Sequence, residues 1–246
     1  MPDASMVREA RIDLAAAFRW AARLDMHESI ANHFSVAVSR DGSKFLLNPA
    51  GRHFSRMRAS DLLLLDALET PSQGAQAPDP TAWHLHAALH QRHPQARCVL
   101  HTHMINVTAL CCLQDFEFLM LDQNACRFHK RIAYDHHYSG MALDASEAHR
   151  VIALLGDDKN VLFMKNHGVM VIAGSVAEAF DELYYLEKAA ALQVRALSTG
   201  QALALIPDAM AATAAAQWRA YPTQFASLHF QALKDILEQE EPDYRT

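Results

Sequence analysis

The residues most suited to chemistry in this sequence are two histidines at the end of an apolar run. His101 and His103 are separated by one residue and follow the apolar segment 98–100. Successive side chains of a β-strand point to opposite faces, so two histidines at this spacing project from one face, about 7 Å apart along the backbone. This geometry suits metal chelation, whereas an ordinary strand histidine hydrogen-bonds a neighbouring backbone group.

A third imidazole is available at His167, between the apolar runs 161–164 and 169–172. Three neutral imidazoles with open coordination positions suit a catalytic zinc ion, and also iron, manganese, cobalt or nickel. Another pair, His84 and His86, lies in a helical pattern, where positions i and i+2 face apart. We therefore do not predict that pair as ligands.

Composition bounds the possible partners. The chain has 246 residues, a net charge of −6 and four cysteines without a CxxC pair. This length suits one α/β domain with a large core, and the acidic balance disfavours nucleic acid and anionic membranes as partners. Unpaired cysteines are typical of a reducing compartment, and no run of 18 apolar residues or signal-like segment is present. We expect a cytoplasmic protein with no membrane or nucleic-acid partner.

Hydrophobic periodicity and cap residues predict the elements that position these side chains. Asp79 and Pro80 supply an N-cap and a first helical residue, and Asp144 with Glu147 resembles a capping box. The predicted helices are 6–25, 81–91, 106–113, 144–156, 175–198 and 208–239, and the predicted strands are 30–38, 44–49, 62–65, 98–103, 116–119, 132–134, 161–164 and 169–172. The pattern indicates one mixed α/β domain over 1–246, with a sheet covered by helices on both faces, a core over about 14–200 and a helical C-terminal extension over 208–239.

Several motifs together resemble the class II aldolase/adducin family. They are NHFS at 32–35, NPAG at 48–51, PTAWHLH at 80–86, CVLHTH at 98–103, the region of Tyr134, and NHGVMVIAGSVAEAF at 166–180. The resemblance implies a three-layer α/β/α sandwich around a mostly antiparallel mixed sheet, and a homotetramer with sites at subunit interfaces. It also implies one divalent metal ion per chain, zinc first and manganese, cobalt or iron as alternatives, on His101, His103 and His167.

The resemblance also suggests residues that contact a small anionic substrate. Tyr134 matches the family's tyrosine acid, although a strand-end tyrosine with a buried ring would look the same. Asn32 matches an asparagine that fixes a loop or a ligand, with an Asx turn as the alternative. Gly51 and Thr81 lie in the substrate-binding loops, and Arg52 is a candidate anchor for a second carboxylate or else a solvated loop arginine.

The sequence departs from the family pattern at the catalytic acid/base. Ala82 stands where the sugar-phosphate aldolases have a glutamate, and alanine cannot transfer a proton. Several hydroxyl donors of the family's phosphate cradle are also missing, since the loops read Asn48-Pro49-Ala50-Gly51 and Pro80-Thr81. A phosphorylated sugar is therefore disfavoured as a substrate, and Glu28 is the one nearby carboxylate that we consider as a replacement for the missing base.

These departures indicate which chemistry remains. A divalent ion on three neutral histidines keeps its full charge and prefers bidentate anions such as 2-oxo, 2-hydroxy or ortho-hydroxyaryl carboxylates. Retro-aldol cleavage needs a base, whereas decarboxylation needs chiefly stabilisation of the developing oxyanion. We therefore expect a metal-dependent lyase that acts on a small unphosphorylated carboxylate, with decarboxylation favoured. A non-catalytic adducin-like assembly module and a mononuclear iron oxygenase are the alternatives.

Overall fold

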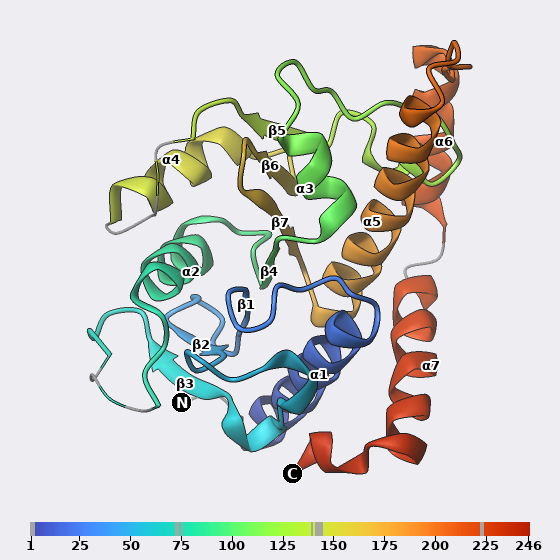
Figure 1. Ribbon diagram of the computed structural model, residues 1–246. Coiled ribbons are helices and arrows are strands. Elements are labelled where there is room, and N and C mark those ends of the chain that lie inside the picture. Colours follow the sequence, from blue (N-terminus) through green and yellow to red (C-terminus); the bar gives the residue numbers. More distant parts are fainter. Residues whose placement is uncertain (1–2, 72–73, 75, 139, 141–144, 222–223) are drawn as a thin grey trace.

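A seven-stranded mixed sheet with the order β3-β2-β1-β4-β7-β6-β5 crosses the protein (Figure 1). The computed structural model describes residues 3–71, 74, 76–138, 140, 145–221 and 224–246. All neighbouring strands pair antiparallel except β5 and β6, which are parallel. The strands are β1 His33–Ala37, β2 Lys44–Leu47, β3 Leu63–Asp66, β4 Cys98–Thr102, β5 Ile132–Asp135, β6 Val161–Met164 and β7 Gly168–Ala173.

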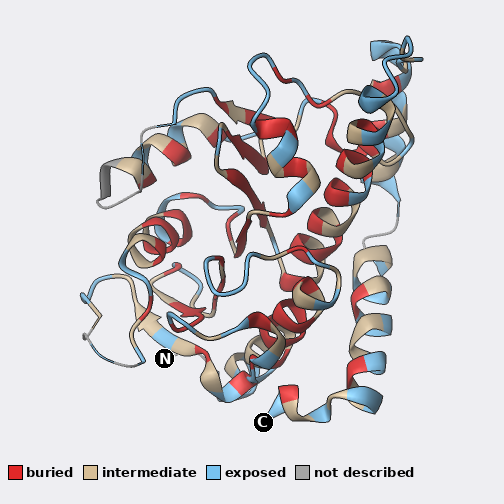
Figure 2. Ribbon diagram, viewed as in Figure 1, coloured by how far each residue is buried: buried red, intermediate tan, exposed pale blue. Residues whose placement is uncertain are grey.

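Helices cover both faces of this sheet, which confirms the predicted three-layer α/β/α fold. One face carries α1 (Ala4–Arg23), α3 (Ile105–Cys111) and α5 (Val176–Ser198), and the other carries α2 (Pro80–Arg92) and α4 (Ala145–Leu155). Buried residues concentrate on the strands and on the sheet-facing sides of these helices (Figure 2). The chain ends in α6 (Asp208–Ala220) and α7 (Gln224–Glu240), and α7 packs against α5.

The helices form where local sequence and core packing agree. Phe18 of α1 is fully buried, and its ring stacks on Phe34 of β1 at 4.7 Å and meets Phe54 edge-on at 4.5 Å. Asp79 caps α2 as predicted, because its carboxylate accepts the Thr81 N–H at 2.9 Å. The predicted cap of α4, Asp144, lies outside the described residues.

One predicted strand is wrong. Residues 116–119 form no strand, although the alternating aromatic residues Phe116 and Phe118 favour one. Side chains satisfy their backbone donors instead: the Phe118 N–H donates to the Tyr134 hydroxyl at 3.1 Å, and the Leu119 N–H donates to Gln193 Oε1 at 3.0 Å. The segment therefore runs beside the sheet without joining its ladder.

The antiparallel pairing of β4 and β7 positions the candidate site. His101 on β4 pairs with His33 on β1 at one side and with Met170 on β7 at the other. Because β4 ends at Thr102 where β7 begins at Gly168, the residues that flank these two ends, His103 and His167, meet at the same edge of the sheet. Among the described residues, none of the helices is long and apolar enough to span a membrane.

Candidate metal centre

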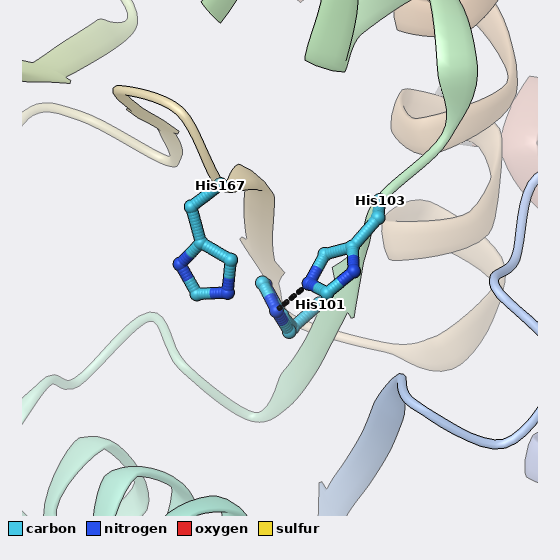
Figure 3. Close-up of side chains that lie close together, drawn as sticks. All are labelled: His101, His103 and His167. Atoms are coloured by element: carbon cyan, nitrogen blue, oxygen red, sulfur yellow. Dashed lines mark hydrogen bonds between the residues drawn. The ribbon is translucent and has the colours of Figure 1, made fainter. Parts of the chain in front are cut away.

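Three imidazoles converge where β4 ends and β7 begins. One ring nitrogen each from His101, His103 and His167 lies within 4.8 Å of the others. The Nε2 atoms of His101 and His103 lie 3.1 Å apart, and His167 faces both rings from the opposite side (Figure 3). The structure thus brings together all three residues that the sequence analysis proposed as ligands.

The outer nitrogens of two of these rings are held by other groups. His101 Nδ1–H donates to the Val169 carbonyl at 3.0 Å, and His103 Nδ1–H donates to the Glu28 carboxylate. When both rings are neutral, both Nε2 atoms carry lone pairs and face each other, an arrangement that is repulsive unless a cation lies between them. Fixing the tautomer through an outer hydrogen bond is how proteins prepare histidine as a metal ligand. This donor set fits a divalent ion.

Burial also keeps two of the three imidazoles, those of His101 and His167, uncharged. It lowers the pKa of His101 well below its usual value of 6.5, and it lowers the pKa of His167 to about 4. A neutral imidazole is the form that binds metal. The ligand nitrogens of His101 and His167 are therefore available at neutral pH without first losing a proton.

The Asn-His-Gly motif has a steric reason at this position. Asn166 adopts a left-handed conformation, with φ of 56°, which asparagine tolerates better than most residues. At Gly168, a Cβ atom would lie 2.5 Å from the Thr102 carbonyl oxygen and 2.8 Å from Cδ2 of His103. The glycine thus lets β7 approach β4 closely enough for the imidazoles to meet.

A cavity of about 550 Å³ lies beside the three imidazoles. Its wall contains three of the four residues proposed for substrate binding, namely Asn32, Gly51 and Thr81. Asn32 is buried, its Oδ1 accepts the Glu28 N–H at 2.6 Å, and its Nδ2 has no partner among the described residues. The described lining includes no lysine or arginine, so an anionic substrate here would depend on a metal ion for positive charge.

Two proposed residues lie away from this cavity. Arg52 is absent from its described lining and pairs with Asp61, with 3.0 Å between Nη2 and Oδ2. Tyr134 lies on β5, three strand positions from β4, which corresponds to about 14 Å at the usual strand spacing. Tyr134 is absent from the described lining of the cavity, and its hydroxyl accepts the Phe118 N–H, so its role as the acid stays a prediction.

The structure adds cavity residues that the sequence analysis did not assign. Ala82 lines the cavity and brings no carboxylate, but Asp79 and Glu147 lie in the same wall, and Tyr138 is also part of it. One oxygen of Asp79 caps α2, and Glu147 pairs with Arg150. Asp79 could have been predicted as a cavity residue from the sequence, because it lies only three residues before Ala82. Tyr138 follows the end of β5 by three residues and had no such signal.

Five groups form a hydrogen-bonded chain that runs from the cavity wall into the protein interior. His33 Nδ1 lies 2.7 Å from His86 Nε2, and His86 Nδ1 is hydrogen-bonded to the Ser35 hydroxyl. Ser35 Oγ lies 2.7 Å from His90 Nε2, and His90 Nδ1 lies 2.6 Å from the Ala96 carbonyl oxygen. Burial lowers the pKa of His33 to about 3 and that of His90 to about 4. The histidines of this hydrogen-bonded chain are therefore neutral at pH 7.

Acid should destabilise the protein through this chain. The pKa of His90 falls from 6.5 to about 4 on folding, so between these values the unfolded chain binds a proton that the folded protein excludes. The contribution of His90 to the free energy of unfolding is fully present above pH 6.5. It decreases as the pH falls to about 4, and the loss for this one group is up to about 3 kcal/mol. Urea unfolding with a chelator present, from pH 7 to 4.5, measures the loss. Substituting the exposed His149 by Asn should leave the profile unchanged, and a flat wild-type profile would contradict the prediction.

Removing the charge beside His103 should weaken metal binding without abolishing it. In Glu28→Gln the side chain can still accept the His103 Nδ1–H but carries no negative charge. Loss of an outer partner of a metal-bound histidine typically costs 10-fold to 100-fold in affinity, and we expect about tenfold here. Zinc titration against a chelating indicator measures it, with the exposed Glu69→Gln as the matched control. Equal affinities for the two variants would contradict this role for Glu28.

Comparisons with known proteins agree with the geometry. Residues 12–194 match the family described as Class II Aldolase and Adducin N-terminal domain. A Pseudomonas aeruginosa protein named "Putative aldolase class 2 protein PA3430" is 33% identical over 96% of this chain and 92% of its own length. Human beta-adducin is 28% identical over 68% of this chain, and the match spans 23% of that adducin.

Solved structures show the same fold. The aldolase II superfamily protein from Pseudomonas syringae superposes with a TM-score of 0.90 at 33% identity, covering 99% of this chain and 98% of that one. L-fuculose 1-phosphate aldolase from Glaciozyma antarctica PI12 superposes with a TM-score of 0.82 at 23% identity, covering 97% and 92%, respectively. The family match, the similar sequences and the shared fold together establish that this chain belongs to the class II aldolase/adducin family.

Proposed function

We propose that this chain is a metal-dependent lyase that cleaves a carbon–carbon bond of a small unphosphorylated carboxylate, with decarboxylation favoured over aldol cleavage. The observation that carries the proposal is the convergence of His101, His103 and His167 with two of their tautomers fixed by outer hydrogen bonds. We propose zinc as the ion, one per chain. A homotetramer in the cytoplasm is part of the same proposal.

The charges of the cavity support an unphosphorylated substrate. The described lining residues include two carboxylates, Asp79 and Glu147, and neither lysine nor arginine. A phosphate group that lies away from the imidazoles would meet no side-chain cation among the described lining residues. A small carboxylate at the imidazoles can take its positive partner from a bound ion. The unpartnered Nδ2 of Asn32 and the hydroxyl of Thr81 would orient such a carboxylate.

The absence of a glutamate at Ala82 supports decarboxylation. A divalent ion at the imidazoles would supply Lewis-acid stabilisation of the oxyanion that develops when the bond breaks. Retro-aldol cleavage would also require a nearby base to remove a hydroxyl proton. Glu28 is hydrogen-bonded to His103, Asp79 caps a helix and Glu147 pairs with Arg150. Each of these carboxylates is already engaged, so loss of carbon dioxide is the less demanding reaction for this site.

Release of carbon dioxide from a defined panel tests the proposal. Zinc-loaded protein is incubated with 2-oxo, 2-hydroxy and ortho-hydroxyaryl carboxylates, and carbon dioxide and aldehyde products are measured separately. We expect carbon dioxide from at least one class and none from the His101→Ala/His103→Ala variant. Aldehyde release in its place would favour aldol cleavage. Turnover that appears only when iron replaces zinc, and that requires dioxygen, would indicate an iron oxygenase. Equal turnover by the double variant would refute a metal-dependent reaction.

A non-catalytic assembly module is the second candidate. It is favoured by the 28% identity with human beta-adducin together with the alanine at position 82. In that case the imidazoles would be a remnant of an ancestral site. Protein that neither contains metal nor takes up added zinc, manganese, cobalt or iron would support this candidate over the lyase.

A further inference from the structure

Hydrogen bonds in the hydrogen-bonded chain from His33 to Ala96 can be donated in only one direction when its histidines are neutral. The Ala96 carbonyl can only accept, so His90 Nδ1 must donate to it, and neutral His90 then presents a lone pair at Nε2. The Ser35 hydroxyl donates to that lone pair. Its proton is then used, so Ser35 accepts from His86 Nδ1–H. A single backbone carbonyl thus sets the tautomer of every member of the chain.

The same logic determines which nitrogen of His33 faces the cavity. Neutral His86 carries its proton on Nδ1 and accepts at Nε2, so His33 must donate from Nδ1 at 2.7 Å. His33 Nε2 is left with a lone pair and hydrogen-bonds none of the described residues. His33 lines the cavity, and its ring lies 4.7 Å from that of His101, centroid to centroid. The lone pair therefore lies in the cavity wall beside the candidate metal centre.

We infer that His33 is a substrate-binding residue that accepts a hydrogen bond from a substrate hydroxyl at Nε2, and that Ser35, His86 and His90 position it by fixing its tautomer. This inference rests on the proposed function and narrows its substrate class to hydroxylated carboxylates. A carboxylate oxygen placed against this lone pair would be repelled, because a carboxylate carries no proton at neutral pH. An O–H group would be favoured, and the cavity thus distinguishes the two ends of a hydroxy acid.

The four hydrogen bonds between His33 and the Ala96 carbonyl maintain this preference for a hydroxyl group from a distance. His86 and His90 are both buried, and Ser35 is fully buried between them. Without the Ser35 hydroxyl, His86 Nδ1–H would lose its acceptor, and the imidazole could exchange its proton to Nε2. His33 would then turn its own lone pair towards His86 and present an N–H to the cavity. Ser35→Ala therefore tests positioning while leaving the His33 side chain in place.

The experiment measures binding of lactate and of propionate, which lacks the hydroxyl, to zinc-loaded protein by calorimetry. We expect the preference for lactate over propionate to fall about tenfold in His33→Leu, the usual cost of one buried hydrogen bond. His33→Gln, which retains an acceptor, should keep most of the preference. Zinc content is measured in each preparation and should stay the same.

A spectroscopic readout separates positioning from general structural damage. Nitrogen-15 NMR of the zinc-loaded protein, assigned with His33→Gln, should show His33 protonated at Nδ1 in the wild type and a changed tautomer in Ser35→Ala. A wild-type His33 protonated at Nε2 would overturn the inference, as would an unchanged lactate preference in His33→Leu, and both results would leave the lyase proposal standing. Failure of zinc-loaded wild-type protein to bind either acid would instead overturn the proposed ligand class and this inference with it.

Discussion

His103→Ala is expected to lower zinc affinity more than 100-fold while the protein stays folded. His103 supplies one of three converging nitrogens, and its removal also leaves the Glu28 carboxylate without its partner. Loss of an outer partner alone typically costs 10-fold to 100-fold, so loss of the ligand itself should cost more. The side chain is partly exposed at 19%, so the substitution opens no large cavity in the core. Competition with a chelating indicator measures the affinity.

The matched control is His84→Ala. His84 belongs to the other HxH pair, on α2, and is not among the clustered imidazoles. We expect this variant to bind zinc as the wild type does, with unchanged circular dichroism for both substitutions. If His103→Ala binds zinc with wild-type affinity, the metal centre lies elsewhere or does not exist.

Gly168→Ala is expected to disrupt both the sheet and the metal centre. The added Cβ would lie 2.5 Å from the Thr102 carbonyl oxygen, a backbone atom, and 2.8 Å from Cδ2 of His103. Strand β7 must move away from β4, or His103 must rotate out of the site. Overpacking of this kind costs roughly 3 kcal/mol in stability. Urea unfolding gives the stability change, and zinc titration gives the accompanying loss of affinity.

Gly174→Ala is the control for this substitution. At Gly174 the added Cβ would meet only Glu178 Oε2 at 2.8 Å, and that flexible carboxylate can turn aside. We expect a change in stability within about 1 kcal/mol and unchanged zinc binding. Comparable losses in the two alanine variants would show that contact with His103 is not what Gly168 protects.

Much of the fold was predictable because local signals and packing agree. Asp79 and Pro80 marked the start of α2, and the apolar run at 98–100 marked the central strand β4. Motif spacing then predicted the layered fold through its resemblance to a family. The predicted strand at 116–119 failed because side chains distant in sequence, Tyr134 and Gln193, provide the hydrogen-bond partners of that segment. Periodicity carries no information about such partners.

The residues of the candidate site likewise fall into those that local sequence predicts and those that depend on tertiary contacts. His101, His103 and His167 were predictable because strand geometry places i and i+2 on one face and because an Asn-His-Gly turn marks a strand end. Arg52 could not be placed from sequence, since its ion pair with Asp61 depends on how the loop after β2 folds. His33 could not be assigned a role from sequence, because its significance depends on pairing between β1 and β4 and on a hydrogen-bonded chain that reaches Ala96.

The most direct test is the metal content of untagged protein, purified without chelator, compared with the His101→Ala/His103→Ala variant. Plasma mass spectrometry should find about one divalent ion per chain in the wild type and none in the variant, and zinc as that ion would agree with the proposed lyase. No metal in the wild type, and no uptake when zinc, manganese, cobalt or iron is added, would contradict a metal centre at these histidines.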